Sequence, residues 1–262
     1  HCILLGLSIG FCSLTYYNAY GYILCSVILC LVSVISNKMK IKEILQKVLI
    51  VALMAFAVAG WWFIRNAIIY DGDILGMKTQ VECGDKYAID KYKPSKRETP
   101  QKNNESVMDM LIKDDWIKTT LKSFVGIFGY QNIIMSSRIY QFYLILWGLG
   151  IIGCLINFKE LFIYNKKEKN RYLLNYIFIP SIIIPIILSI YYSYTSDYQA
   201  QGRYIMGIII PFTYFLVSGI KTILEKFIKS EKIRNIIIIV IMVIIILIAQ
   251  RALFGYIIPT YK

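Results

Sequence analysis

Long apolar stretches alternate with short polar ones along most of the chain. The polar residues between them separate seven apolar segments, at residues 2–16, 19–36, 48–70, about 140–158, 172–195, 204–220 and 236–254. An α-helix needs roughly 20 consecutive apolar residues to cross the hydrocarbon core of a bilayer, and several of these segments approach or exceed that length. The pattern therefore predicts an all-α, polytopic transmembrane helix bundle of about seven spans, in which residues 1–262 form a single transmembrane domain.

The first segment is short and begins directly at His1, without a charged region before it. This start has none of the features of a signal peptide. We expect the chain to be the C-terminal part of a longer protein whose N-terminus is missing. The first interruption falls at Tyr16-Tyr17-Asn18. Pro180, Pro185 and Pro211 fall inside spans, where neighbouring helices or water can satisfy the freed carbonyls.

The short basic loops predict how the helices are oriented. Residues 37–47 contain four Lys or Arg, residues 159–171 contain five and residues 221–235 contain five. Cytoplasmic loops are enriched in Lys and Arg, and alternation through the spans places all three loops on one side. They are therefore expected in the cytoplasm of a cell membrane, with the segment 71–139, residues 196–203 and the C-terminal tail outside.

The extracytoplasmic segment 71–139 has two predicted parts. Residues 91–105 are polar, contain proline and are typical of a loop. Ser106 to Asp109 resembles a capping box, and it is followed by apolar residues at helical spacing that include Met110, Trp116 and Phe124. This spacing predicts one amphipathic helix over about 106–124, lying on the outer surface of the membrane.

Composition agrees with a membrane protein and excludes several other classes. The chain is 57% hydrophobic, with a mean hydropathy of +0.57 and a formal net charge of +13. In a soluble protein this charge would suggest nucleic acid, but here the positive residues lie in short loops, so no nucleic-acid partner is expected. His1 is the only histidine and no C-x-x-C occurs, which leaves zinc sites and disulfides unsupported. The abundance of Lys, Ile, Tyr and Asn suggests an AT-rich bacterial genome.

Few charged residues fall outside the loops and the tail, and each is predicted near the outer end of a helix: Arg65, Asp197, Arg203 and Arg251. Transporters coupled to ions usually carry such residues near the midplane, so this placement disfavours a transporter. A guanidinium group offers a rigid fork of donors that matches phosphate oxygens. The arginines therefore indicate a site for a lipid-linked phosphate. The alternative is that each arginine only anchors its helix at the interface, and Arg251 is the weakest candidate.

Two short stretches surround the stronger arginine candidates. Arg65 lies in Gly60-Trp61-Trp62-Phe63-Ile64-Arg65-Asn66, where the tryptophans are typical of the headgroup level. An arginine inside a span costs roughly 2.5–3.5 kcal/mol, so it is normally near an interface, paired or functional. Arg203 lies in the polar turn Gln201-Gly202-Arg203-Tyr204. We expect Asn66, Gln201 and Tyr204 to bind the donor phosphate together with these two arginines.

The carboxylates on the same side are weak candidates for a catalytic base. A sugar transfer with inversion needs one carboxylate to deprotonate the acceptor, and cations to stabilise the departing phosphate. Asp71 and Asp73 flank Gly72, and Asp197 precedes Arg203. Asp-Gly-Asp is equally an ordinary turn after a helix, so the base stays unassigned. No cofactor is evident, and no residue pattern supports the divalent metal that such a transfer can use.

Four stretches of the chain carry a resemblance to a known family: Trp61 to Asn66 with the turn from Tyr70 to Gly76, Ser123 to Gly129, Gln201 to Tyr204, and Gly6 to Thr15. They resemble elements of a family of bacterial polysaccharide-associated membrane proteins grouped with the GT-C superfamily of integral-membrane glycosyltransferases. Trp61-Trp62-x-x-Arg65-Asn66 and the turn from Tyr70 to Gly76 resemble its W-W-x-x-R-N…Y-G-D-x-x-G pattern. Ser123 to Gly129 is similar to its S-F-x-G-x-F-G element, and Gln201 to Tyr204 to its Q-G-R-Y element. Gly6 to Thr15 is similar to a G-L-x-x-G…L-T-K helix, except that Tyr16 replaces the lysine.

The resemblance implies transfer of a sugar from a polyprenyl-phosphate donor to a glycan or lipid acceptor at the outer membrane face. In that superfamily the catalytic acidic motif lies in the first outer loop, near the protein N-terminus, and we expect it in the missing N-terminal part. Two alternatives stay open. The first alternative is a non-catalytic membrane protein of polysaccharide export or polymerisation. The second is a fragment of a transporter.

Overall fold

The computed structural model describes residues 1–15, 19–36, 39–163 and 168–262. These residues form two compact units. The first unit contains His1–Val107 and Ile183–Gln199, and the second contains Met108–Ile182 and Ala200–Lys262. Tyr16, Tyr17, Asn18, Lys38, Lys166 and Lys167, which entered the predictions above, lie outside the described residues.

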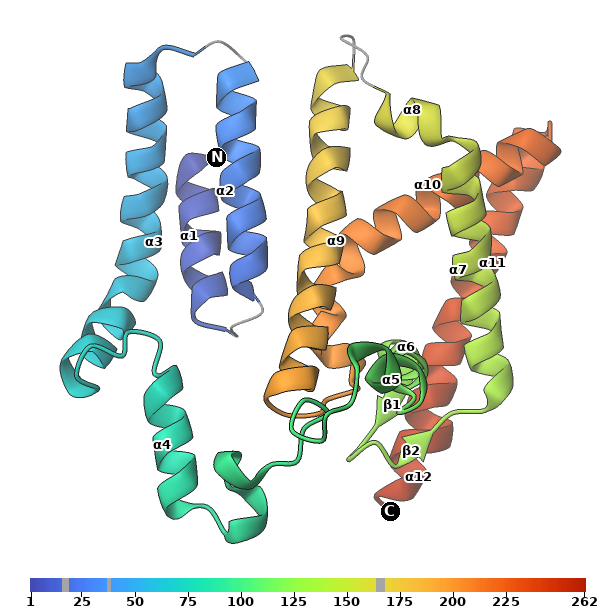
Figure 1. The fold of residues 1–262 in the computed structure, drawn as a ribbon. Coiled ribbons are helices and arrows are strands. Elements are labelled where there is room, and N and C mark those ends of the chain that lie inside the picture. Colours follow the sequence, from blue (N-terminus) through green and yellow to red (C-terminus); the bar gives the residue numbers. More distant parts are fainter. Residues whose placement is uncertain (16–18, 37–38, 164–167) are drawn as a thin grey trace. The chain divides into compact units, whose positions relative to one another are not determined.

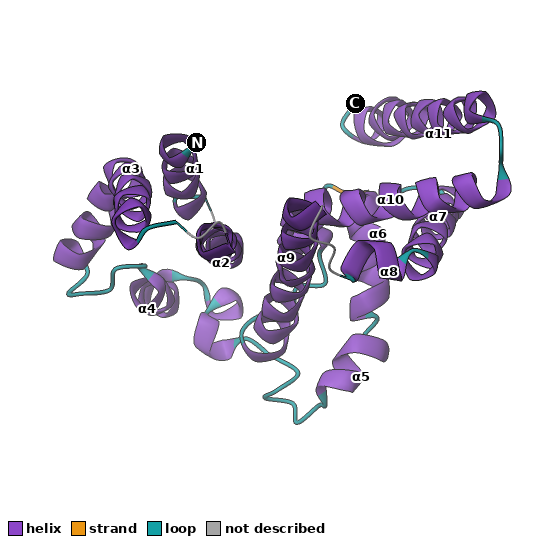
Figure 2. Cartoon of the chain, turned by 90° about the horizontal axis from the view of Figure 1, so that it is seen from above, coloured by secondary structure: helices purple, strands orange, loops and turns teal. Residues whose placement is uncertain are grey.

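Helices dominate the described chain, so the predicted all-α class is confirmed (Figures 1 and 2). Within the described residues, five helical stretches are long and apolar enough to cross a membrane: Ile41–Ile69, Ser137–Ile156, Lys169–Thr195, Gly202–Phe227 and Glu231–Thr260. Two shorter apolar helices, Cys2–Ser13 and Tyr20–Ser33, precede them. These lengths and compositions indicate a membrane-embedded protein.

The first unit begins with three neighbouring helices, α1 (Cys2–Ser13), α2 (Tyr20–Ser36) and α3 (Ile41–Ile69) (Figures 1 and 2). Two glycines one turn apart let α1 approach α3 closely. A Cβ on Gly6 would lie 2.6 Å from Met54 Cβ, and a Cβ on Gly10 would lie 2.6 Å from Val58 Cβ. Small residues spaced by four are a common way for membrane helices to pack without a hydrophobic driving force.

The helices extend into regions that the sequence assigned to loops, which corrects three predicted boundaries. Helix α3 begins at Ile41, inside the predicted loop 37–47. The region 159–171 contains α8 (Phe158–Phe162) and the start of α9 (Lys169–Thr195). Only Ile228–Ser230 separate α10 (Ile209–Phe227) from α11 (Glu231–Ala252), although 221–235 was predicted as loop. Lysine and glutamate are good helix formers, so a charged stretch at the end of a span can continue the helix.

Part of segment 71–139 belongs to the first unit and contains a helix that the sequence did not predict, α4 (Met77–Tyr87). It is followed by two short 3₁₀ turns, η2 (Asp90–Tyr92) and η3 (Pro94–Lys96). The Asp85 carboxylate accepts a hydrogen bond from the Ser95 N–H at 2.8 Å, which connects α4 to η3. The following loop is attached to the end of α9, because the Gln101 N–H donates to the Tyr194 carbonyl at 3.2 Å.

The prediction of a single amphipathic helix over about 106–124 is wrong, because this region contains two helices. They are α5 (Val107–Ile112) and α6 (Trp116–Gly126). Asp115 lies between them in the left-handed conformation, with φ of 57°, which interrupts the helix. A short antiparallel hairpin follows, in which β1 (Ile127–Phe128) pairs with β2 (Ile133–Ile134).

The long helices of the second unit are α7 (Ser137–Ile156), the first half of α9, α10 and α11, which continues into η6 (Leu253–Ile257) and α12 (Ile258–Thr260). A glycine contact brings α7 and α10 together, because a Cβ on Gly153 would collide with the backbone of Gly219. Buried Met135, Ile139, Tyr140 and Ala252 form a core cluster beside the hairpin. The Ser136 N–H donates to the Tyr256 hydroxyl at 3.1 Å, which holds the C-terminal helix against β2.

Candidate functional site

Arg65 lies near the end of α3, next to a buried amide. Its Nη1 donates to Asn66 Oδ1 at 3.2 Å, and its guanidinium lies 5.8 Å from the centre of the Tyr70 ring. Asn66 is only 1% exposed, and its Nδ2 donates to the Ile74 carbonyl at 3.2 Å. Both ends of this amide are therefore occupied within the fold, and Asn66 fixes the turn that follows α3. Arg65 itself is exposed.

The Asp-Gly-Asp turn joins α3 to α4. Asp71 has a φ of 46° and Gly72 a φ of 90°, so the chain reverses here in the left-handed region. The Asp73 Oδ2 accepts a hydrogen bond from the Thr79 N–H at 2.8 Å, in the first turn of α4. This hydrogen bond lowers the pKa of the Asp73 carboxyl. A carboxylate with a lowered pKa is a weaker base, so Asp73 acts here as a cap for α4. Asp71 is exposed.

Asp197, the third carboxylate candidate, is part of an ion pair at the end of α9. Its Oδ2 lies 3.3 Å from Nη1 of Arg97 and accepts a hydrogen bond from Gln199 Nε2 at 2.9 Å. The ion pair holds the loop after η3 against the C-terminal end of α9. Together with the hydrogen bond from the Tyr194 hydroxyl to the Glu105 carbonyl at 2.9 Å, it attaches residues 97–105 to that helix.

Arg203 lies in η5 (Gly202–Ile208), the 3₁₀ turn that precedes α10. Arg203 is exposed. Its Nη2 donates to the Tyr204 hydroxyl at 3.1 Å, and its guanidinium lies 5.0 Å from the centre of the Tyr204 ring. No carboxylate among the described residues forms an ion pair with it. The Gln201 carbonyl accepts the N–H of Tyr204 at 3.2 Å, which closes the turn. Arg251, in the last turn of α11, is also exposed.

The turn that carries Arg203 packs directly on α6. A Cβ on Gly202 would collide with the backbone at Ser123 and Phe124, so only glycine fits at this contact. The ring of Phe124 in turn makes edge contacts with Trp147 and Phe212, at 5.9 and 6.0 Å between ring centres. Two elements that the sequence singled out separately, Ser123 to Gly129 and Gln201 to Tyr204, are therefore in contact within one unit.

The predicted site residues divide between the two units. Arg65, Asn66, Asp71, Asp73 and Asp197 belong to the first unit, whereas Gln201, Arg203, Tyr204 and Arg251 belong to the second. Within the first unit Arg65 contacts Asn66, and within the second Arg203 contacts Tyr204. The prediction that Arg65 and Arg203 bind one phosphate stays a prediction.

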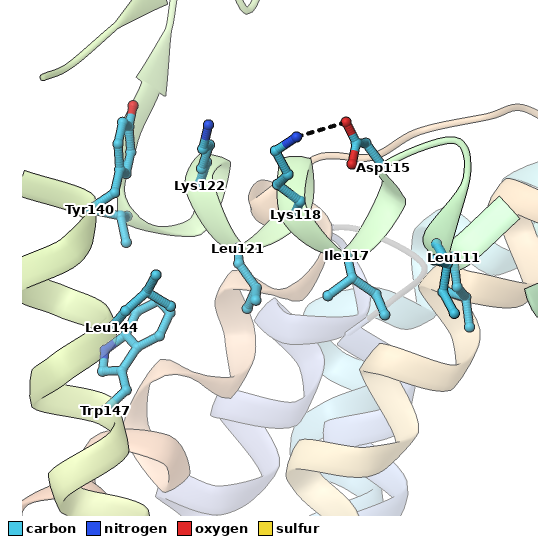
Figure 3. Close-up of a pocket in the computed structure, with 11 residues that line it drawn as sticks. Leu111, Asp115, Ile117, Lys118, Leu121, Lys122, Tyr140, Leu144 and Trp147 are labelled. Carbon is cyan, nitrogen blue, oxygen red and sulfur yellow. Dashed lines mark hydrogen bonds and ion pairs between the residues drawn. The ribbon is translucent and has the colours of Figure 1, made fainter. Parts of the chain in front are cut away.

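A groove of about 380 Å³ lies between helices α5 and α6 on one side and α7 on the other, entirely within the second unit (Figure 3). Figure 3 shows its apolar part beneath α6, formed by side chains such as Leu121, Leu144 and Trp147. The polar ends of Lys118, Lys122 and Tyr140 lie along the opposite edge. Lys118 pairs with Asp115 at 2.9 Å, and the Lys122 ammonium lies 5.7 Å from the centre of the Tyr140 ring.

None of these groove residues was among the site residues predicted from the sequence. Lys118 and Lys122 are four residues apart on an amphipathic helix, so they share one face of α6, and this spacing was a signal that could have been used. The wall of the groove on α7 could not be predicted from the sequence, because its position depends on how α7 packs beside α6.

Among the described residues, no group of three or more His, Cys, Asp or Glu side chains could hold a metal ion. Comparison of the chain with protein-family models, with curated proteins and with solved structures finds no match.

Proposed function

We propose that the protein is a membrane glycosyltransferase that transfers a sugar from a polyprenyl-phosphate donor to a glycan or lipid acceptor at the outer face of the membrane. The observation that carries this proposal is the exposed guanidinium of Arg203, which has no carboxylate partner among the described residues and lies on a turn packed against α6. An arginine of this kind can offer its donors to phosphate oxygens.

The surroundings of Arg203 support a phosphate that belongs to a lipid. The turn that carries Arg203 packs on α6, because a Cβ on Gly202 would collide with the backbone at Ser123 and Phe124. Both elements adjoin membrane-length helices, α10 and α7. A lipid-linked donor presents its phosphate at the level where such helices end.

We propose that Arg65 and Arg203 bind the donor phosphate, with Asn66, Gln201 and Tyr204 supporting them and with Arg251 as a weaker contributor. In this arrangement Asn66 and Tyr204 act by positioning, because each is hydrogen bonded to the arginine beside it. The catalytic base is left unassigned, since Asp73 and Asp197 are both occupied by structural contacts.

The proposed topology has seven spans, with α1 and α2 as the two short ones. The basic regions 37–47, 159–171 and 221–235 lie in the cytoplasm, and segment 71–139 lies outside. Cys83, an exposed cysteine on α4, reports this orientation. A membrane-impermeant thiol reagent is expected to label Cys83 in intact cells, and labelling that requires lysis would contradict the topology.

The function is tested by sugar transfer in membranes that contain the full-length gene product. Membranes with the wild-type protein are supplied with a panel of radiolabelled polyprenyl-phosphate-linked sugars, and incorporation into surface glycan or lipid is measured. Arg203→Ala is expected to reduce incorporation by at least tenfold, because removing one partner of a charge-assisted contact typically costs about 2 kcal/mol or more. Arg203→Lys retains the positive charge but lacks the forked donors of the guanidinium group. Its sugar incorporation should therefore fall between that of the wild type and that of Arg203→Ala.

Arg138→Ala is the matched control, because Arg138 is an exposed arginine at the start of α7 outside the proposed site. It should transfer sugar like the wild type. Transfer at the wild-type rate by Arg203→Ala would contradict the proposed role of Arg203. A wild-type protein that transfers none of the sugars, when supplied with acceptor membranes, would favour the non-catalytic alternatives.

A further inference from the structure

The groove between α6 and α7 combines an apolar wall with a cationic edge, and neither feature is used by the proposed transfer. Its apolar residues Ile117, Leu121 and Leu144 are 44%, 37% and 53% exposed, although they lie side by side. Contiguous exposed apolar surface of this kind usually faces a partner or a lipid. A volume of about 380 Å³ is within the range of ligand pockets.

The polar and apolar parts of the groove lie at different positions along the axis of α7. Tyr140, Leu144 and Trp147 follow one another at spacings of four and three, so they share one face of that helix. At a rise of about 1.5 Å per residue, Trp147 lies about 10 Å further along the axis than Tyr140. The polar end of the groove is therefore at the start of a membrane-length helix, and the apolar part extends toward its middle.

The charges at the polar end favour an anion. Lys118 and Lys122 are like charges at a spacing of four, which is unfavourable for an isolated helix. Asp115 neutralises one of them through its ion pair with Lys118. Lys122 is half-buried and has no carboxylate partner among the described residues, so one net positive charge remains at the edge of the groove.

We infer that this groove binds one anionic phospholipid of the surrounding bilayer, with its phosphate beside Lys118 and Lys122 and an acyl chain along Leu121, Leu144 and Trp147. The charge of a phosphodiester is complementary to the single net positive charge at the edge. Lysine suits this role because its ammonium is a flexible point charge with three donors. The bound lipid fixes the amphipathic helix α6 at the membrane surface, and this site is separate from the proposed donor site at Arg203.

The experiment uses the full chain, purified and reconstituted into nanodiscs, and counts retained lipids by native mass spectrometry. The probes are phosphatidylglycerol, phosphatidylcholine with the same acyl chains, and polyprenyl phosphate, offered to the wild-type protein in competition. Phosphatidylglycerol is expected to be retained over phosphatidylcholine, and raising the salt concentration should weaken this preference. Equal retention of the two phospholipids would overturn the proposal. So would displacement of phosphatidylglycerol by an equal amount of polyprenyl phosphate.

Variants locate the retained lipid. Lys118→Gln and Lys122→Gln are each expected to lower phosphatidylglycerol affinity by about fivefold, from the typical effect of one lysine near an anionic membrane surface. Lys118→Arg with Lys122→Arg should retain it. Lys78→Gln with Lys86→Gln is the matched control, because both lysines lie on α4 in the first unit. Leu144→Trp narrows the apolar part and should reduce retention without changing the charge.

Wild-type retention in the double variant Lys118→Gln with Lys122→Gln would overturn the inference. Each variant is compared by thermal unfolding before the lipids are counted, and the competition on the wild-type protein decides the matter for any variant that does not fold. Sugar transfer is measured on the same samples. Loss of lipid retention with transfer intact separates this inference from the proposed function, and loss of transfer in Arg203→Ala with retention intact does the reverse.

Discussion

Arg65 and Arg203 are both exposed arginines next to a polar side chain, yet the structure uses their surroundings differently. Around Arg65, polar groups are paired with one another: Asn66 is 1% exposed and reaches the Ile74 carbonyl, and Asp73 caps α4. Around Arg203, the turn packs on α6 through Gly202, and the Arg203 side chain contacts Tyr204 next to it. The comparison indicates that hydrogen bonds among polar groups shape the turn beside Arg65, whereas packing on α6 positions the turn that carries Arg203.

The largest effect is expected where the second region depends on one contact. Gly202→Ala places a methyl group against the α6 backbone, so η5 must move away and carry Arg203 with it. Overpacking of this kind typically costs about 1–3 kcal/mol. We expect a clear loss of thermal stability together with at least tenfold slower sugar transfer, measured by thermal unfolding and by incorporation of labelled sugar.

Gly148→Ala is the control for this prediction. Gly148 lies in α7 of the same unit, and a Cβ there would meet nothing within 4 Å. Because alanine is the better helix former, this change should leave stability equal or raise it by up to about 1 kcal/mol. Unaltered stability and transfer in Gly202→Ala would show that the α6–η5 contact does not position Arg203.

A smaller effect is expected in the first region. Asn66→Leu keeps the approximate volume of the side chain but removes the hydrogen bonds to Arg65 and to the Ile74 carbonyl. The net loss should be about 1 kcal/mol in the free energy of unfolding, measured by thermal or denaturant unfolding in detergent. Asn103→Leu, at an exposed position, should change it by less than about 0.5 kcal/mol. A stable Asn66→Leu protein that has lost sugar transfer would reverse our assignment and make Asn66 a direct phosphate ligand.

The sequence predicted the helical class and the approximate position of the apolar segments. It did not predict α4, because the segment 77–87 has little hydrophobic character and its start depends on the Asp73 side chain reaching Thr79. It also treated residues 106–124 as one helix, because helical spacing continues through Lys113–Asp115 although Asp115 adopts a left-handed conformation. The groove was not predicted either, since its wall on α7 comes from tertiary packing.

The smallest predicted effect is a loss of stability of the first unit at acidic pH. Hydrogen bonds from Thr79 and from Ser95 lower the pKa of Asp73 and of Asp85, and hydrogen bonds from Lys93 and Lys96 lower the pKa of Asp90. Since the folded pKa lies below the unfolded one, these contacts stabilise the first unit above the unfolded pKa of about 4 and lose their effect as the pH falls through the folded pKa.

Asp73→Ala tests this sign. The difference in melting temperature between the wild-type protein and Asp73→Ala should be present at pH 7 and should shrink toward zero in strong acid. A difference that grows as the pH falls would mean that Asp73 is stabilised in its protonated form, contrary to the hydrogen bond from Thr79. Asp71→Asn, at an exposed position whose φ of 46° asparagine also tolerates, should show little difference at either pH.

Phosphate recognition by Arg203 is central to the proposed function, and a direct binding measurement tests it. Radiolabelled polyprenyl phosphate is titrated into phosphatidylcholine nanodiscs that contain the full chain, as wild type, Arg203→Ala or Arg138→Ala. We predict that Arg203→Ala weakens binding by at least tenfold, while Arg138→Ala binds like the wild type. Equal affinity in all three proteins would contradict the account.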